Sequence, residues 1–461
     1  MRLIDREMTC RRRRGHPLAG LALAAIPAAP GALAQAAPEP PPRIAHASPQ
    51  HRDENGEMLK RKAAAITLAF TYNSDANADV SGGGSTGGAY LQRIGAIADA
   101  DLDRLLGWHG ASAHLSVHAI QGTGLSGRRV GNILTVSGIE AEPALRLFNL
   151  WIEQKLGSRL TVRAGQFTAG QEFAISPTAN LFVNSTFGWP GSFATDLPSG
   201  GPAYPLSAPG VRVALQADAR TIVRIALFAG DPAGRGGGDP QRRDLHGFNG
   251  FRFQGSPFVI GEIGRSAGGD DPAWSVALGG WVHFDRFDDL RYDIAGGSLA
   301  APLSSGQPAR HAGNHAAYAI ADGRLWRSGA RSLHGFIRLS ASPADRNPID
   351  LYLDGGLALT APFAGRPNDS LGLGVAIART SPRRRALIRD QAALTGIPAH
   401  PADAEAVIEA SYQLKLASAI YVQPNLQWIV HPSGALLGDL ADYRDPPGHA
   451  LVVGLRTSVR L

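Results

Sequence analysis

Cysteine, lysine and long apolar runs are scarce in this chain of 461 residues. The one cysteine is Cys10, so the rest of the chain has no thiol for a disulfide, a metal site or a nucleophile. Lysine occurs four times, which argues against a lysine-lined path for anions. Beyond residue 34 no apolar run of about 18 residues occurs, which excludes a helical membrane protein.

The amino-terminal segment has the composition of a secretory leader. Arg11–Arg14 precede the apolar stretch Pro17–Ala34, which ends in an Ala-Leu-Ala triplet. This pattern predicts a signal peptide over residues 1–34, while a start at Met8 and cleavage two or three residues later stay open. Its removal takes away six arginines and two acids and lowers the formal charge from +6 to +2.

The remaining chain is predicted to have two parts. Residues 35–62 are rich in proline, histidine and charge, which predicts a flexible periplasmic arm. Residues 63–461 are glycine-rich and have a low charged fraction, which is typical of an outer-membrane barrel.

The carboxyl-terminal segment alternates between apolar and polar or small side chains. One face carries Leu451, Val453, Leu455, Thr457, Val459 and Leu461, and the other carries Val452, Gly454, Arg456, Ser458 and Arg460. This period of two predicts a strand with one apolar face. A transmembrane barrel pairs its last strand with its first, so an apolar strand at the end of the chain indicates a barrel seam.

Segments of this kind recur along the chain at the length that a tilted strand needs to cross hydrocarbon. They predict an all-β protein, a 16-stranded antiparallel transmembrane β-barrel of the porin class with long external loops, some folded into the lumen. The predicted strands are 64–72, 89–101, 111–120, 148–156, 160–167, 211–217, 222–229, 256–264, 273–285, 316–327, 332–341, 350–360, 370–379, 404–416, 420–430 and 450–461.

The connections between these segments alternate between long and short, as expected of a barrel with a periplasmic amino terminus. The long connections are 73–88, 121–147, 168–210, 230–255, 286–315, 342–349, 380–403 and 431–449. The third of them is rich in proline and glycine and is the natural pore constriction, because sixteen strands leave an aqueous channel unless something folds inward.

The polar faces of the strands predict a polar lumen. Its candidate sugar-binding groups are guanidinium, carboxylate, amide and indole side chains, which offer hydrogen bonds and aromatic faces to a sugar: Trp151, Glu153, Arg163, Arg212, Arg224, Arg338, Glu409, Gln423, Asn425 and Gln427. Glu142 and Arg146 are four residues apart, and one helical turn would place them side by side at the mouth. Each of these groups is more often a solvated wall residue or a structural ion pair.

Catalytic and metal chemistry are not indicated. His114 and His118 are about 13 Å apart on a strand, too far for one metal ion. No compact Ser–His arrangement occurs, so we expect neither an enzyme nor a cofactor.

Several segments resemble the carbohydrate-selective porin family, the OprB-like porins. They include Arg146–Gln154, Leu160–Gln166, Glu172–Pro177, Phe182–Pro190, Pro198–Pro205, Phe228–Pro232, Asp345–Asp350 and Val422–Gln427, and the similarity runs from about residue 85 to the end. The resemblance implies a sixteen-stranded outer-membrane channel that passes glucose and related sugars by facilitated diffusion. It assigns the eyelet to Glu142 and Arg146, with Arg163 and Trp151 as wall partners.

The chain departs from this family at two places. Leu461 stands where the family usually has Phe, and Asp322-Gly323 stands where family members often have Asp-Gln. The expected partners are carbohydrate substrates, outer-membrane lipid and the barrel-assembly machinery, which would bind the last strand; a homotrimer is possible and no nucleic acid is expected. The alternative function is a general or anion-preferring porin, because arginines attract phosphates and carboxylates.

Overall fold

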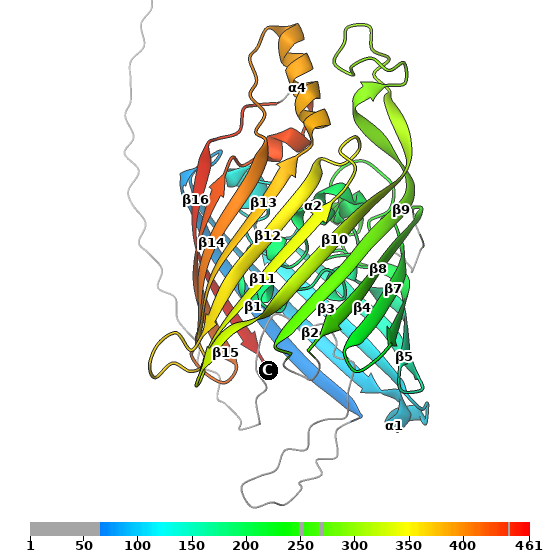
Figure 1. Cartoon of the computed structure of the whole chain (residues 1–461), viewed down its shortest axis with the longest axis vertical. Helices are drawn as coiled ribbons and strands as arrows, with labels where there is room; N and C mark the ends of the chain where they lie inside the picture. The colour runs from blue at the N-terminus through cyan, green and yellow to red at the C-terminus, as the bar shows by residue number, and fades with distance from the viewer. Residues whose placement is uncertain (1–64, 249–252, 254, 268–271, 441–442) are drawn as a thin grey trace, which may run out of the picture. The chain divides into compact units, whose positions relative to one another are not determined.

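The computed structural model describes residues 65–461 except 249–252, 254, 268–271 and 441–442. The predicted signal peptide and periplasmic arm, residues 1–34 and 35–62, lie outside the described residues. Within the described residues, sixteen strands close into one antiparallel barrel, and the predicted fold class is confirmed (Figure 1).

Each strand pairs with its neighbours in sequence, and β1 also pairs with β16. The strands are β1 (Ile66–Gly82), β2 (Gly87–Asp101), β3 (Ala111–Gly122), β4 (Ala144–Leu156), β5 (Leu160–Phe167), β6 (Ala208–Gln216), β7 (Thr221–Ala229), β8 (Pro257–Ser266), β9 (Trp274–Asp293), β10 (Pro308–Ser328), β11 (Arg331–Ala341), β12 (Ile349–Thr360), β13 (Ser370–Thr380), β14 (Ala404–Lys415), β15 (Ile420–Val430) and β16 (His449–Arg460).

Helices occupy the connections. The α-helices are α1 (Leu102–Leu106), α2 (Gly191–Asp196), α3 (Pro240–Arg243) and α4 (Pro382–Thr395). Single turns are η1 (Ser126–Val130), η2 (Ala169–Gln171), η3 (Ala179–Leu181), η4 (Ser185–Phe187), η5 (Pro198–Gly200) and η6 (Gly434–Leu437). In the part of the chain that the structure describes, no helix has the length and apolar composition to cross a membrane.

The predicted seam between the first and last strands is confirmed. Leu461 and Phe70 exchange two backbone hydrogen bonds, with N···O distances of 2.8 and 2.9 Å. Further along, Asp75 lies opposite Arg456, which donates from Nε and Nη2 to the carboxylate at 2.7 and 2.6 Å. This ion pair helps to fix the register, because a one-residue shift would turn Arg456 from the lumen toward lipid.

The first strand is longer than predicted. β1 continues to Gly82, so the external connection predicted over 73–88 shrinks to residues 83–86. The added stretch places the buried Asp75, Asn77 and Asp79 on the inner face. Its outer residues are mostly small, namely Ser74, Ala76, Ala78, Val80 and Gly82. A strand with small outer side chains lacks the apolar alternation that identifies strands in a sequence.

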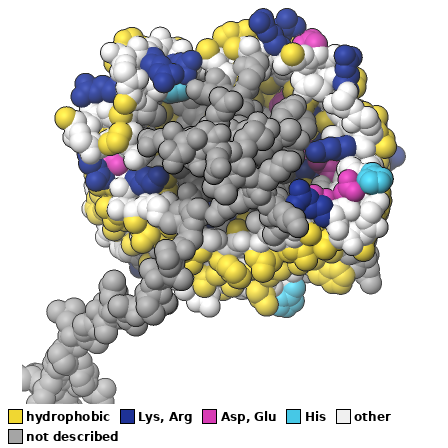
Figure 2. Space-filling model, turned by 90° about the horizontal axis from the view of Figure 1, so that it is seen from below, with side chains coloured by type: hydrophobic (Ala, Val, Ile, Leu, Met, Phe, Trp, Pro, Cys, Tyr) yellow, Lys and Arg dark blue, Asp and Glu magenta, His cyan; other side chains and the backbone are white. Residues whose placement is uncertain are grey.

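The outer wall is apolar, as expected for a surface that faces lipid. Leu278, Leu373 and Val453 are 63, 53 and 40% exposed on β9, β13 and β16. Viewed from the end shown in Figure 2, hydrophobic side chains gather along much of the outer rim. Trp274 on β9 and Trp428 on β15 also lie on this outer face, where they are 42 and 48% exposed.

Two external loops fold into the lumen, as predicted for the longer one. We call residues 123–143 loop 2, residues 168–207 loop 3 and residues 230–256 loop 4. The main chain of loop 3 reaches the far wall, where Val183 N donates to Glu409 Oε1 of β14 at 2.7 Å. The helix α4 instead extends past the ends of the strands, at the end of the barrel opposite the carboxyl terminus (Figure 1).

Candidate channel constriction

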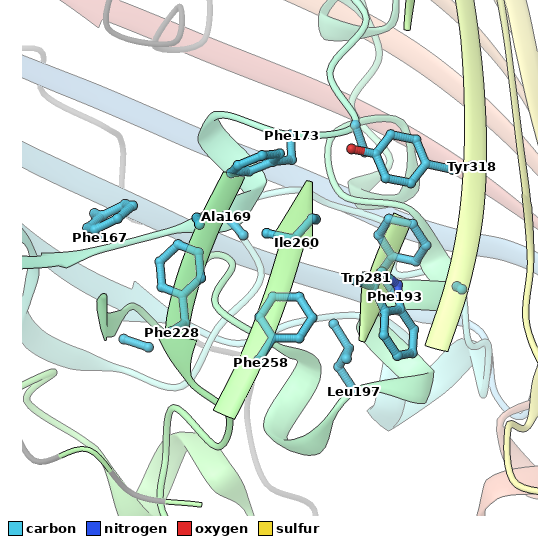
Figure 3. Packing of buried hydrophobic residues seen from close by; sticks show 14 of the residues in the cluster. Phe167, Ala169, Phe173, Phe193, Leu197, Phe228, Phe258, Ile260, Trp281 and Tyr318 are labelled. Carbon is cyan, nitrogen blue, oxygen red and sulfur yellow. The ribbon is translucent and has the colours of Figure 1, made fainter. Parts of the chain in front are cut away.

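An apolar surface inside the barrel carries loop 3. Phe228, Phe258 and Trp281 on the inner face of β7, β8 and β9 lie together with Phe173 and Phe193 of loop 3 (Figure 3), and all five are at most 2% exposed. Burial of each such side chain contributes about 1.5–3 kcal/mol. The prediction of a polar lumen is therefore wrong at Phe228, Phe258 and Trp281, which loop 3 covers, whereas Arg224 of β7 and Glu262 of β8 form an ion pair at 3.3 Å.

A group of four charged residues anchors the beginning of loop 3. Glu172 of the loop accepts from Arg163 Nη1 and Arg212 Nε, both at 2.6 Å. Glu153 of β4 accepts from the same two arginines at 2.8 and 2.5 Å. All four side chains are at most 9% exposed. The structure thus brings together three predicted residues, Glu153, Arg163 and Arg212, with two charges of each sign.

The predicted aromatic residue Trp151 already has partners on both sides. Its ring stacks on His114, with centroids 4.9 Å apart and planes 7° apart. The guanidinium carbon of Arg163 lies 3.6 Å from the centroid of the Trp151 ring. Trp151 is 7% exposed, so little of its surface is open to a ligand.

Arg338 holds the central part of loop 3. It donates to both carboxylate oxygens of Asp354, at 3.0 and 2.5 Å. It also donates to the carbonyl oxygens of Ala174 and Thr186 at 2.6 and 2.9 Å. Arg338 is fully buried, so the prediction that it lines an open lumen is wrong: loop 3 covers it.

Wall side chains on β14 and β15 hold the far limb of loop 3 and the adjacent part of loop 2. Glu409 accepts from the backbone N–H groups of Val183 and Asn184 at 2.7 and 2.8 Å. The predicted Gln427 accepts from Asn184 Nδ2 at 3.0 Å and donates to the carbonyl of Val136 at 2.9 Å. Gln427 is fully buried, so its amide is already used in holding the loops.

The predicted pairing of Glu142 with Arg146 is wrong. Arg146 lies in β4 and donates to the carbonyl oxygens of Asp244 and Gln241 in loop 4, whereas Glu142 pairs with Arg242 at 3.2 Å. Glu142 lies in loop 2, ahead of the first residue of β4, and no helical turn forms to bring it beside Arg146. Burial raises the pKa of the Asp244 carboxyl, which lies 4.0 Å from Arg146.

Part of the inner wall on β1 and β2 stays partly exposed. There Asn73 and Arg93 are opposite each other in the sheet, and both are partly exposed. Tyr204 of loop 3 faces them, with the guanidinium carbon of Arg93 5.3 Å from the centroid of its ring. The Tyr204 hydroxyl donates to the carbonyl of Ile139 in loop 2 at 3.1 Å, which joins the tips of the two loops.

Arg93 and Tyr204 were missed in the sequence. On β2 the inward positions include Leu91 and Ile97 as well as Arg93, and the outward positions include Gln92. The outward positions also include Ile94, which is 45% exposed, so apolar residues lie on both faces of β2. Hydropathy alternation therefore could not show which way Arg93 points. Tyr204 lies in a proline-rich segment whose path only the folded loop defines.

A closed barrel with an apolar outer wall and a lumen narrowed by inward loops defines the class of protein: an outer-membrane porin. The chain belongs to the carbohydrate-selective porin family, OprB, whose family model matches residues 85–461. It is thus a multi-pass outer-membrane channel for carbohydrates, and its family and fold are those of channels.

Relatives agree with this assignment. Porin B of Pseudomonas aeruginosa is 24% identical over 436 residues, which cover 88% of this chain and 89% of that protein. The high-pH structure of OprB from Pseudomonas putida is 22% identical, with a TM-score of 0.76, and the match covers 86% of this chain and 94% of that one.

Proposed function

We propose that glucose and related sugars cross by passive, facilitated diffusion along the inner face of β1 and β2, beside the joined tips of loops 2 and 3. The observation that carries this proposal is the partial exposure of Asn73, Arg93 and Tyr204, which lie where the tip of loop 3 meets the wall. These residues offer an amide, a guanidinium and an aromatic ring, the groups that hydrogen-bond sugar hydroxyls and stack on sugar C–H faces.

The residues predicted to form the eyelet have two different roles in this proposal. Arg146, Arg338 and Gln427 are fully buried, and Glu153, Arg163 and Arg212 are engaged in the group of four charges. We propose that these six residues, with Trp151, position the loops that narrow the channel. Glu142, paired with Arg242 in loop 4, is assigned to the outer mouth.

The mechanism needs no conformational cycle. Solute binding in a channel must be favourable enough for entry and weak enough for release. Single hydrogen bonds that replace bonds to water contribute about 0.5–1.5 kcal/mol each, which suits weak and reversible binding. Loops 2 and 3 reduce a lumen that sixteen strands would otherwise leave wide.

Current through single channels in planar bilayers tests the proposal. Glucose at millimolar concentration should reduce the ion current of the wild-type protein in a concentration-dependent way. Tyr204→Leu should weaken this block because it removes the ring that faces Arg93. Tyr90→Leu is the matched control, since Tyr90 lies on the outer face of β2 and is 49% exposed. Currents indifferent to glucose, or equally affected in both variants, would contradict the proposal.

Two further partners, lipid and the assembly machinery, follow from the sequence and from the apolar outer wall of the barrel. We propose that outer-membrane lipid covers the apolar outer face and that the barrel-assembly machinery binds the last strand. A homotrimer stays a prediction.

A further inference from the structure

Arg93 is an arginine without a counter-ion in a lumen where other arginines are paired. It forms no hydrogen bond or ion pair with another described residue, and its buried Nε has no acceptor. Its one aromatic contact is with Tyr204, at 5.3 Å. A charged group that is partly removed from water without an opposite charge is costly, so the position favours an anionic ligand.

More unused polar groups lie beside Arg93. His118 on β3 is fully buried, and neither of its ring nitrogens has a partner among the described residues. It lies opposite Arg146 in the sheet, whose Nε is also buried without an acceptor. Unpartnered groups that are deeply buried mark a place where a ligand can supply the missing hydrogen bonds.

The carboxylates nearest Arg93 are held by other groups. Asp75 is taken by Arg456 and by Ser137, whose hydroxyl donates to it at 2.5 Å. Asp244 lies against Arg146, with 4.0 Å between the charged atoms. Glu140 accepts from Ser126 N and Oγ, so Arg93 forms no ion pair with any of the three carboxylates. A carboxylate matches the charge of Arg93, whereas a phosphate monoester carries about −1.5 to −2 at neutral pH.

Aromatic rings complete the site. His118 stacks on Phe148 with centroids 4.5 Å apart, and Phe148 meets Tyr204 edge to face at 5.7 Å. Because the Arg93 guanidinium lies 5.3 Å from the centroid of the Tyr204 ring, a sugar in contact with Tyr204 would bring a carboxyl group at its edge within reach of Arg93.

We infer that the site formed by Arg93 and Tyr204, with the buried His118 behind it, binds monosaccharides that carry a carboxylate, such as hexuronates, in preference to neutral hexoses. The inference rests on the proposed function, because it assumes that sugars pass this part of the lumen. The carboxylate pairs with Arg93 in a charge-assisted hydrogen bond, and Tyr204 contacts the sugar ring.

Block of single-channel current by glucose, by glucuronate and by inorganic phosphate tests the inference. In the wild type, glucuronate should half-block at a concentration about tenfold lower than glucose, the size expected of one charge-assisted hydrogen bond. Arg93→Gln should bring the two concentrations close together, and Arg93→Lys should keep part of the difference. Arg265→Gln is the control, because it removes an equal charge from an exposed outward position on β8. This variant should keep the full difference between the half-blocking concentrations of glucose and glucuronate.

Voltage provides a readout that needs no variant: block by glucuronate should depend on membrane voltage, and block by glucose should not. If glucose blocks and glucuronate is no more effective, the inference fails and the proposed function stands. If phosphate blocks as well as glucuronate and Arg93→Gln weakens both equally, the site selects anions in general and the assignment to sugar acids is overturned. If neither sugar blocks, the proposed function fails, and this inference fails with it.

Discussion

Replacement of Arg338 by methionine should release the central part of loop 3. The side chain is fully buried and makes two hydrogen bonds to Asp354, at 3.0 and 2.5 Å, and others to loop carbonyls, among them Ala174 at 2.6 Å. The variant leaves the Asp354 carboxylate buried and unpaired, and breaking a buried pair in this way costs about 3–5 kcal/mol.

The expected result is a wider and less stable channel. Loop 3 should detach from β11 and β12, so that single-channel conductance rises and added protease cleaves within residues 168–207 of the folded barrel. The double variant Arg338→Met with Asp354→Leu is the matched control. It removes both charges, so it should recover much of the thermal stability that the single variant loses.

The reasoning would be refuted by an Arg338→Met protein with wild-type conductance and wild-type thermal unfolding in detergent. It would also be refuted by a double variant less stable than Arg338→Met, because the loss would then come from packing rather than from an unpaired charge.

Three further predictions concern the loops and the seam. Burial raises the pKa of Asp196, which accepts from Ile349 N and Ser342 Oγ, both at 3.1 Å. A raised pKa means that its contribution to stability is complete below the unfolded value of about 4 and is lost as pH rises through the folded value. Thermal unfolding should therefore show this pH dependence in the wild type and lack it in Asp196→Asn. Glu172→Gln leaves Arg163 and Arg212 facing one carboxylate, that of Glu153, so the reversal potential in a salt gradient should shift toward anion selectivity. An unchanged reversal potential would contradict the account in which the charges of these four residues cancel. Leu461→Phe should raise the yield of folded barrel in cells at unchanged conductance, because the family usually has Phe at this position. An equal yield would show that the assembly machinery does not prefer a terminal phenylalanine in this chain.

The strands could be predicted because lipid on one side and polar groups on the other impose a period of two. In β15, Leu426 and Trp428 are 44 and 48% exposed, while Gln427 between them is fully buried. The rule fails where both faces are covered. Phe258 and Ile260 point inward on β8 and pack under loop 3, so hydropathy alternation is weak there.

The site was only partly predictable, because a loop covers much of the inner face that carries it. Inward polar residues could be identified, but whether they meet water or a loop depends on how loop 3 crosses the lumen. Glu172 and Arg212 are forty residues apart and meet only because the loop returns to the wall. The local spacing of Glu142 and Arg146 misled, because β4 begins at Ala144 and a strand replaces the expected helical turn.

The central claim is that solutes pass beside the contact between Arg93 and Tyr204. Its most direct test is a single cysteine at position 93 in a chain that lacks Cys10, so that no other thiol competes for reagent. A bulky thiol reagent should then abolish most of the ion current through Arg93→Cys channels and leave Tyr90→Cys channels, labelled on the outer face of the same strand, unchanged. Fully labelled Arg93→Cys channels that conduct as before would show that the path lies elsewhere in the barrel.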